Sequence, residues 1–400
     1  MTPTERLYQP SLKGKGIKTA CFGILIFMES YSLYLHIPFC RSRCSYCDFN
    51  TFAGMEYLLN DYSDALCREI EFIADSLDEM IPAHTIYFGG GTPSLLNPKQ
   101  LDKILNKIHQ KFQVSKDLEV TLEANPGTIN PSYLNDLHCT GINRLSIGMQ
   151  SAIPEELRLL GRTHNIDDVI NTMKWARQAV IDNLNLDLIF GLPGQSLEAW
   201  QHTLELALLL QPEHLSLYSL TVEHGTPMYN WLHRGLLPDI DADLAADMYE
   251  WASIRLEAAG YAQYEISNWA KHRGEKLLAC HHNLQYWKNR PYLGFGAGAH
   301  GYANNMRVAY VLSINEYIDR CFHPASKEFP RSPATNVEEI IDYKNEMAET
   351  MMMGLRLTIE GVSSSEFKSR FGKTLLDMYQ KEIDELLKWG LLEWIGEGES

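Results

Sequence analysis

Apolar side chains follow two alternating patterns along the chain. Runs with the length and composition of strands lie at residues 33–37, 85–88, 119–123, 144–148, 184–190 and 215–220. Between them, apolar residues step by three and four positions, as from Leu58 to Leu77 and from Leu101 to Phe112, which predicts amphipathic helices. Strands that alternate with helices form a parallel sheet, which right-handed crossovers curl into part or all of a barrel. The pattern therefore predicts an α/β fold.

Polar, glycine-rich loops follow most of these predicted strands. They lie at residues 38–40, 89–93, 123–127, 148–151 and 191–195. Any one of them could be an ordinary turn, but α/β barrels place their active sites at the carboxyl ends of the strands. We therefore expect these loops to form one functional site.

The alternation of strands and helices ends near residue 227, which divides the chain into four expected parts. These are an N-terminal extension that we expect to be poorly ordered, a barrel core, a mixed region rich in Tyr, Trp and Gly, and a C-terminal module (residues 1–30, 31–227, 228–330 and 335–400). The last part has three helical segments and a short apolar strand from Leu391 to Ile395, which suggests a winged helix. Its 7 basic and 14 acidic residues argue against DNA binding and favour a packing or lid module.

The N-terminal extension resembles a signal peptide in one respect only. Lys13, Lys15 and Lys18 precede an apolar run at residues 20–28, but Glu29 follows directly and no small-residue cleavage site is present. We therefore do not expect secretion. Met28 is an alternative to Met1 as the natural start of the protein.

Composition narrows the possible partners and the compartment. The chain is 45% hydrophobic and 22% charged, as in globular proteins, and its net charge of −16 argues against coating nucleic acid or an anionic membrane. Three of its eight cysteines lie within eight residues, and the other five are scattered singly (Cys21, Cys67, Cys139, Cys280 and Cys321). Such a distribution is no disulfide framework, so we expect a cytoplasmic protein with a metal site.

The clustered cysteines, Cys40, Cys44 and Cys47, form a CxxxCxxC motif after the first predicted strand. Three thiolates in one loop can hold three corners of a cubane [4Fe–4S] cluster. Phe49 stands where a nearby fourth cysteine could be, so one iron would stay open for chemistry or substrate. The alternatives are a structural zinc with a distant fourth ligand, or thiols that are clustered by chance.

This spacing resembles the radical S-adenosylmethionine (radical SAM) superfamily. In that superfamily the open iron binds the amino and carboxylate groups of SAM, and the reduced cluster cleaves SAM to a 5′-deoxyadenosyl radical. Further motifs at residues 34–40, 89–93, 123–127, 145–150, 160–164 and 185–193 resemble one branch, the anaerobic coproporphyrinogen III oxidases and the related HemW heme chaperones. The resemblance covers residues 31–310 and implies a partial TIM-type (β/α)6 barrel with a smaller α+β C-terminal part.

The resemblance also implies roles for individual residues. It makes Cys40, Cys44 and Cys47 the cluster ligands, and it places Tyr34, Tyr46 and Glu123 against the cluster-bound SAM. Six more residues match positions that hold a second SAM in the oxidase, which leaves open whether a second SAM binds here: Gly90, Gly91, Thr92, Gln150, Arg162 and Asp187. Glycine amides can approach a carboxylate closely, and acidic side chains can hold hydroxyls or an ammonium group. An ordinary ion pair between Asp187 and Arg162 is the alternative for those two residues.

Two features distinguish the related branches. The oxidases carry a further cysteine two positions after the third, where this chain has Phe49, and HemW-type proteins carry an HNxxYW motif. That motif is present here as His282, Asn283, Tyr286 and Trp287. An imidazole can be an axial ligand of heme iron, and aromatic rings can pack against the macrocycle. Cys280 or His281 could ligate instead, and a histidine among aromatic residues can also simply belong to the core.

The resemblance therefore implies a heme chaperone that binds heme, a [4Fe–4S] cluster and SAM, and that passes heme to recipient hemoproteins. No catalytic residue is assigned. The resemblance leaves room for a homodimer and for peripheral membrane contact through the recipients. The alternative function in porphyrin metabolism is an oxygen-independent coproporphyrinogen III oxidase, which would form protoporphyrinogen IX by radical decarboxylation. A third possibility is a scaffold in which the cluster is purely structural.

Overall fold

The computed structural model describes residues 30–395 of the chain. The signal-like run, the choice between Met1 and Met28 and nearly all of the expected N-terminal extension lie outside these residues. Within the described part, no helix is both long enough and apolar enough to cross a membrane.

Six parallel strands form the centre of the molecule, and they coincide with the six strands predicted from the sequence. They are β1 (Tyr31–Ile37), β4 (Ile81–Gly90), β5 (Phe112–Ala124), β6 (Arg144–Gln150), β7 (Asn183–Phe190) and β8 (His214–Ser219). Their order in the sheet is β8-β7-β6-β5-β4-β1. Strands β1 and β8 pair with other strands and not with each other, so the barrel is partial, as expected.

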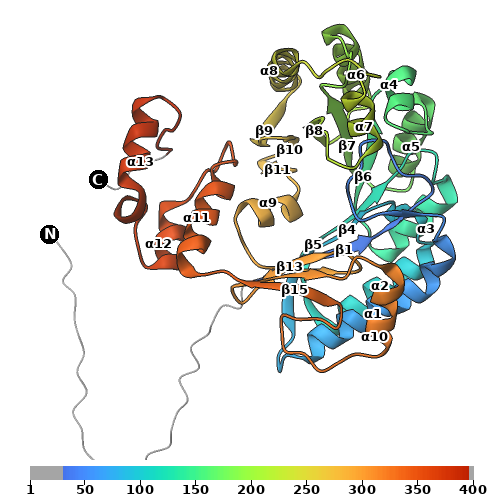
Figure 1. Cartoon of the computed structure of the whole chain (residues 1–400), viewed down its shortest axis with the longest axis vertical. Coiled ribbons are helices and arrows are strands. Elements are labelled where there is room, and N and C mark those ends of the chain that lie inside the picture. Colours follow the sequence, from blue (N-terminus) through green and yellow to red (C-terminus); the bar gives the residue numbers. More distant parts are fainter. Residues whose placement is uncertain (1–29, 396–400) are drawn as a thin grey trace, which may run out of the picture.

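Helices connect these strands and cover the outer face of the sheet (Figure 1). They are α1 (Leu59–Asp75), α2 (Pro98–Lys111), α3 (Pro131–Thr140), α4 (Pro154–Leu159), α5 (Ile166–Gln178) and α6 (Leu197–Leu209). Helices α2 and α5 begin with capping boxes at Asn97 and Asn165. Each asparagine side chain accepts a hydrogen bond from a backbone N–H group of the first turn, which has no partner within the helix. Leu66, Ile70 and Ile73 on the apolar face of α1 pack into the core. The spacing of apolar residues by three and four positions therefore predicted this helix and its buried face correctly.

The region after residue 227 extends the sheet at both edges. After α7 (Pro227–His233) and α8 (Ala242–Ala258), strands β9 (Tyr261–Glu265), β10 (Asn268–Arg273) and β11 (Lys276–Leu277) join the β8 edge. Helix α9 (His281–Trp287) then leads to β12 (Tyr292–Phe295), which pairs in parallel with β1. Strands β13 (His300–Ala303), β14 (Met306–Tyr310) and β15 (Thr335–Ile340) continue that edge in antiparallel order, with α10 (Ile314–Phe322) between the last two in sequence.

The C-terminal helices gather at one side of the molecule, away from helices α1 to α5 (Figure 1). They are α11 (Tyr343–Gly354), α12 (Ser364–Phe371) and α13 (Leu375–Lys388), and they enclose a small core of their own around Met347, Phe367 and Ile383. The expected strand from Leu391 to Ile395 is wrong, because residues 391–395 form no strand. Leu391 and Ile395 are 66% and 68% exposed, and no strand among residues 30–395 pairs with them.

Candidate functional site

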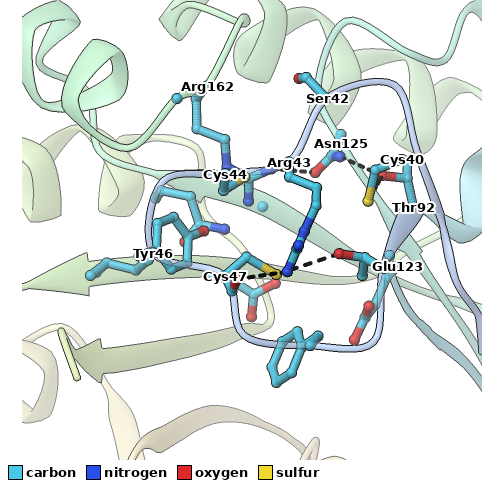
Figure 2. A pocket seen from close by; sticks show the side chains of 18 of the residues that line it. Cys40, Ser42, Arg43, Cys44, Tyr46, Cys47, Thr92, Glu123, Asn125 and Arg162 are labelled. Atoms are coloured by element: carbon cyan, nitrogen blue, oxygen red, sulfur yellow. Dashed lines mark hydrogen bonds between the residues drawn. The ribbon is translucent and has the colours of Figure 1, made fainter. Parts of the chain in front are cut away.

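A cavity of about 680 Å³ opens at the carboxyl ends of the parallel strands, and the three clustered cysteines line it (Figure 2). The loop that carries them joins the short strands β2 (Phe39–Cys40) and β3 (Phe52–Ala53). The ends of β4, β5, β6, β7 and β8 and the connection between α4 and α5 supply the rest of the wall. Four of the five predicted loops therefore meet in one site, because parallel strands bring their carboxyl ends to the same edge. The loop at residues 191–195 does not line the cavity, and β7 contributes Asp187 and Ile189 instead.

The cysteine loop is held in place from two sides. At its centre, Ser45 donates its backbone N–H to the carbonyl of Leu160 at 3.1 Å and its hydroxyl to the carbonyl of Leu159 at 2.6 Å. At its end, the amide group of Asn50 donates to the backbone oxygens of Ala297 and Leu312 at 3.0 and 2.9 Å. The loop is thus tied both to the connection between α4 and α5 and to the strands beyond β1.

Two hydroxyls reach the cysteine sulfurs. Thr92 donates to the Sγ of Cys40 at 3.7 Å, and the hydroxyl of Thr51 lies 3.9 Å from the Sγ of Cys47. Burial raises the pKa of both thiols, Cys40 and Cys47. Cys44 lies on the same cavity wall. Among residues 30–395, no three His, Cys, Asp or Glu side chains converge closely enough to hold a single metal ion.

Glycines after β4 allow the backbone to approach this loop closely. A Cβ at Gly91 would lie 2.6 Å from the backbone oxygen of Phe39 and 3.0 Å from the Sγ of Cys40. A Cβ at Gly90, where φ is +111°, would lie 2.5 Å from the ring of His36. A side chain at Gly91 would displace the backbone or the cysteine, and one at Gly90 would displace the His36 ring, which is why the sequence has glycine at both positions.

Two half-buried carboxylates face the cavity. Glu123 accepts hydrogen bonds from the hydroxyl of Tyr87 at 2.8 Å and from the N–H of Gly90 at 3.1 Å. Asp187 accepts from the hydroxyl of Ser146 at 2.9 Å and from the side-chain amide of Asn185 at 2.8 Å. Burial raises the pKa of both acids, that of Glu123 to about 7, to which the neighbouring charge of Asp187 adds.

One half-buried cation, Arg162, also lines the cavity. Arg162 donates to the side-chain oxygen of Asn125 at 2.7 Å, and Asn125 in turn donates to Thr92 at 3.0 Å. The Nε of Arg162 is buried and has no hydrogen-bond partner in the described part of the chain. No ion pair links Arg162 to Asp187 among the described residues, so the ordinary-pair alternative for these two is not what the structure contains. A guanidinium with a buried, unused donor is suited to an anionic ligand.

The structure places all but one of the expected cluster and SAM residues around this cavity. Those that line it are Cys40, Cys44, Cys47, Tyr46, Gly90, Gly91, Thr92, Glu123, Gln150, Arg162 and Asp187. Tyr34 does not line it; the Tyr34 side chain borders a second cavity on the other side of the cysteine loop. Sequence reasoning assigned no role to Tyr87 or Asn125. Asn125 lies in a glycine-rich loop that the sequence did single out, whereas Tyr87 carried no local signal.

The HNxxYW histidine lies below the cavity and is 2% exposed. Thr85 donates its hydroxyl to Ser32, so it accepts from Nδ1 of His282 at 2.8 Å, and Tyr286 lies 3.0 Å from Nε2. Burial lowers the pKa of His282 to about 3, so the ring is neutral and its one lone pair meets the hydroxyl of Tyr286. Both ring nitrogens are therefore occupied.

The His282 ring also stacks on Tyr87, with centroids 4.9 Å apart, and Tyr87 is the residue that holds Glu123. The other motif residues are separated from one another. Tyr286 borders the second cavity, Trp287 lies against the guanidinium of Arg356, and Asn283 lines neither cavity.

Comparison with known proteins places these features in a family. Residues 34–207 match the family model described as the radical SAM superfamily, and residues 341–398 match the HemN C-terminal domain. The chain is 39% identical over 363 residues to the heme chaperone HemW of Bacillus subtilis strain 168, covering 90% of this chain and 92% of the relative. It is 35% identical to the mitochondrial radical S-adenosyl methionine domain-containing protein 1 of Mus musculus, covering 90% of this chain and 81% of that one.

A solved structure shows the same fold. Coproporphyrinogen III oxidase (HemN) from Escherichia coli, described as a radical SAM enzyme, superposes with a TM-score of 0.75 at 21% identity. The match covers 90% of this chain and 83% of the oxidase.

Proposed function

This chain belongs to the HemW family of heme chaperones within the radical SAM superfamily, and we propose that it binds heme and passes it to recipient hemoproteins. The observation that carries the proposal is the 39% identity to a HemW protein over 92% of that protein's length. The similarity is therefore not confined to the barrel that many radical SAM proteins share. The scattered cysteines support a cytoplasmic location.

The residues around the first cavity fit a [4Fe–4S] cluster and SAM. Cys40, Cys44 and Cys47 supply thiolates from one short loop, and Gly91 leaves the space beside Cys40 that any side chain would fill. The unpartnered Nε of Arg162 supports an anionic group in the same cavity. When bound, the cluster and SAM would supply one-electron chemistry.

The chain's own residues would hold and orient the SAM molecule. Glu123 and Asp187 offer carboxylate oxygens to an ammonium group or to ribose hydroxyls, while Arg162 offers N–H donors to a carboxylate. Tyr87 and the N–H of Gly90 fix Glu123 from two sides, so its rotamer is set before any ligand arrives. Such preorganisation lowers the entropy that binding costs.

We infer a carrier and not a catalyst, because curated relatives across the length of the chain are named as heme chaperones. The likeness to HemN, at 21% identity, shows the fold alone. A coproporphyrinogen III oxidase assay with SAM and dithionite should therefore give no protoporphyrinogen. Formation of that product would favour the enzyme.

Hemin titration into the anaerobically reconstituted protein tests the proposal. We expect a saturable Soret band, which should decrease when an apo-hemoprotein is added and takes up the heme. A protein that binds no hemin saturably, or that keeps all of it in the presence of the acceptor, would overturn the proposed function.

A further inference from the structure

A second cavity of about 670 Å³ lies on the other side of the cysteine loop. It is bordered by Arg43 and residues 48–52 of the loop region, by Tyr34 and His36 of β1, and by residues of α9, β12, β13 and the segment after β14. Its volume lies within the roughly 300–1,000 Å³ of small-molecule pockets. Nothing in the first cavity's chemistry uses it.

Aromatic and apolar side chains form part of the wall of this second cavity, and Asp48, Asn50 and Thr51 add polar groups to it. Tyr34, Phe52, Tyr286 and Tyr292 line it, and the rings of Tyr286 and Tyr292 meet edge to face with centroids 4.6 Å apart. Two large apolar side chains at the cavity are exposed to solvent: Phe49 is 63% exposed and Leu312 is 62% exposed. An apolar ligand in the cavity would cover them, which is favourable in proportion to the area removed from water.

Two imidazoles border the second cavity, and only one of them is free. His36 is buried; its Nε2 donates to the backbone oxygen of Asn50 at 2.9 Å, and its Nδ1 accepts from the hydroxyl of Tyr34 at 3.0 Å. His300, the first residue of β13, is exposed, and no hydrogen bond in the described part of the chain involves its ring. Partial burial and the charge of Arg307 lower the pKa of His300, which favours the neutral imidazole that binds metals.

One cation also borders the cavity. Within residues 30–395 the guanidinium of Arg43 makes one hydrogen bond, of 3.2 Å to the backbone oxygen of Cys47, which leaves donors for a further partner. A flat apolar ligand with a metal at its centre and carboxylates at one edge matches this combination of aromatic walls, free imidazole and guanidinium.

We propose that the second cavity is the heme site and that His300 is an axial ligand of the heme iron, a proposal that rests on the function proposed above. The propionate groups of the heme pair with Arg43, and the rings of Phe49 and Tyr286 pack against the macrocycle. His282 of the HNxxYW motif contributes indirectly, by holding Tyr286 through its Nε2. Iron could reach that nitrogen only by displacing the tyrosine hydroxyl.

The position of this site also relates heme to the cysteines. Arg43, Asp48, Phe49 and Thr51 border both cavities, so heme and the cysteine cavity lie on opposite sides of one loop. These shared residues give a change on one side, such as the binding of a cluster or SAM, a physical route to the heme side.

Hemin titration of the cluster-loaded protein tests this site with two variants. His300→Ala removes the proposed ligand, and His202→Ala removes an exposed histidine of α6 that borders neither cavity. We expect His300→Ala to shift the Soret maximum and to weaken hemin binding by about tenfold, which corresponds to about 1.4 kcal/mol. His202→Ala should behave as the wild type. Added imidazole should restore the wild-type Soret position in His300→Ala, which a merely structural role of His300 would not predict.

The outcomes separate the site from the function. If wild type binds hemin and His300→Ala has the same spectrum and affinity, the site is wrong and the chaperone function stands. If His282→Ala loses the ligand signal and His300→Ala keeps it, the ligand belongs to the motif. If wild type binds no hemin, the proposed function itself fails. Leu312→Asp should weaken hemin binding without moving the Soret maximum, because it changes a wall of the cavity and not the ligand.

Discussion

A buried acid, Glu69, should make the stability of the fold depend on pH. Glu69 lies on α1 with no exposed surface, and its Oε2 accepts from the N–H of Gly296 at 2.9 Å and from the hydroxyl of Tyr317 at 2.7 Å. Its Oε1 has no hydrogen-bond partner in residues 30–395. Burial raises the pKa of Glu69 from 4.5 to about 7. The acid thus joins α1 to the β12 edge of the sheet in its protonated form.

The sign and the size of the pH dependence of the unfolding free energy follow from these two pKa values. Because the pKa is higher in the folded state, the stabilisation is complete below pH 4.5 and is lost as the pH rises through 7. The gap of about 2.5 between the values corresponds to about 3 kcal/mol of unfolding free energy. Most of that loss, about 2.5 kcal/mol, falls between pH 5 and pH 8.

Glu69→Gln removes the ionisation and should remove this pH dependence. Urea unfolding of the cluster-free protein, followed by circular dichroism at pH 5 and pH 8, measures it. The difference in unfolding free energy between the variant and wild type should be about 2.5 kcal/mol more favourable to the variant at pH 8 than at pH 5. Glu71→Gln on the same helix is the control: hydrogen bonding to Lys107 lowers the pKa of this exposed acid, so the effect should be opposite in sign and under about 1 kcal/mol. Parallel pH responses of Glu69→Gln and wild type would refute the reasoning.

Three further predictions concern the first cavity. Cys44→Ala should lose most of its iron after anaerobic reconstitution, because the two remaining thiolates cannot hold a cubane cluster. The control Cys67→Ser should keep its iron, and loss of iron from it would mean that the site is elsewhere. Gly91→Ala places a Cβ 2.6 Å from a backbone oxygen and should also lower the iron content. Gly225→Ala, whose Cβ would have no atom within 4 Å, should not lower it. Equal iron contents in the two variants would contradict the inference that Gly91 is needed for close approach. Tyr87→Phe removes the hydroxyl that holds a cavity carboxylate and should weaken SAM binding in equilibrium dialysis by roughly threefold to tenfold, from a hydrogen bond worth about 0.5–1.5 kcal/mol; an unchanged affinity would show that the hydroxyl orients nothing.

The barrel core was predictable because its signals are local. Each of the six strands is a short apolar run between segments of helical spacing, and the structure has a strand at each. The sheet edges were not predictable in the same way. Strand β12 pairs with β1, which places Leu293 beside Leu33 although most of the chain separates them in sequence. No local pattern specifies such a distant partner. The run from Leu391 to Ile395 looked like a strand but has no partner, and it is not one.

The residues of the first cavity show the same difference between local signals, which the sequence reveals, and long-range contacts, which it does not. The cysteine spacing is contiguous in sequence and identifies the loop by itself. Tyr34 lies five residues before that loop's strand pair begins at Phe39, yet it does not line the first cavity, because Tyr34 and His36 share the face of β1 that borders the second cavity. Tyr87 holds a carboxylate 36 residues away, a contact that exists only once β4 and β5 are paired.

The histidine motif is where sequence and structure differ most in meaning. A motif specifies which side chains are present, but a histidine can bind a metal only through a nitrogen whose lone pair is free. For His282 that condition is decided by Thr85, 197 residues away, and by Tyr286, one helical turn away, and together they leave neither nitrogen free. His300 belongs to no motif, but at the exposed start of β13 its ring has no hydrogen-bond partner among the described residues, and it lies beside a partly aromatic cavity. The choice between these two histidines is therefore made by tertiary contacts, and only a ligand-specific measurement on each can report it.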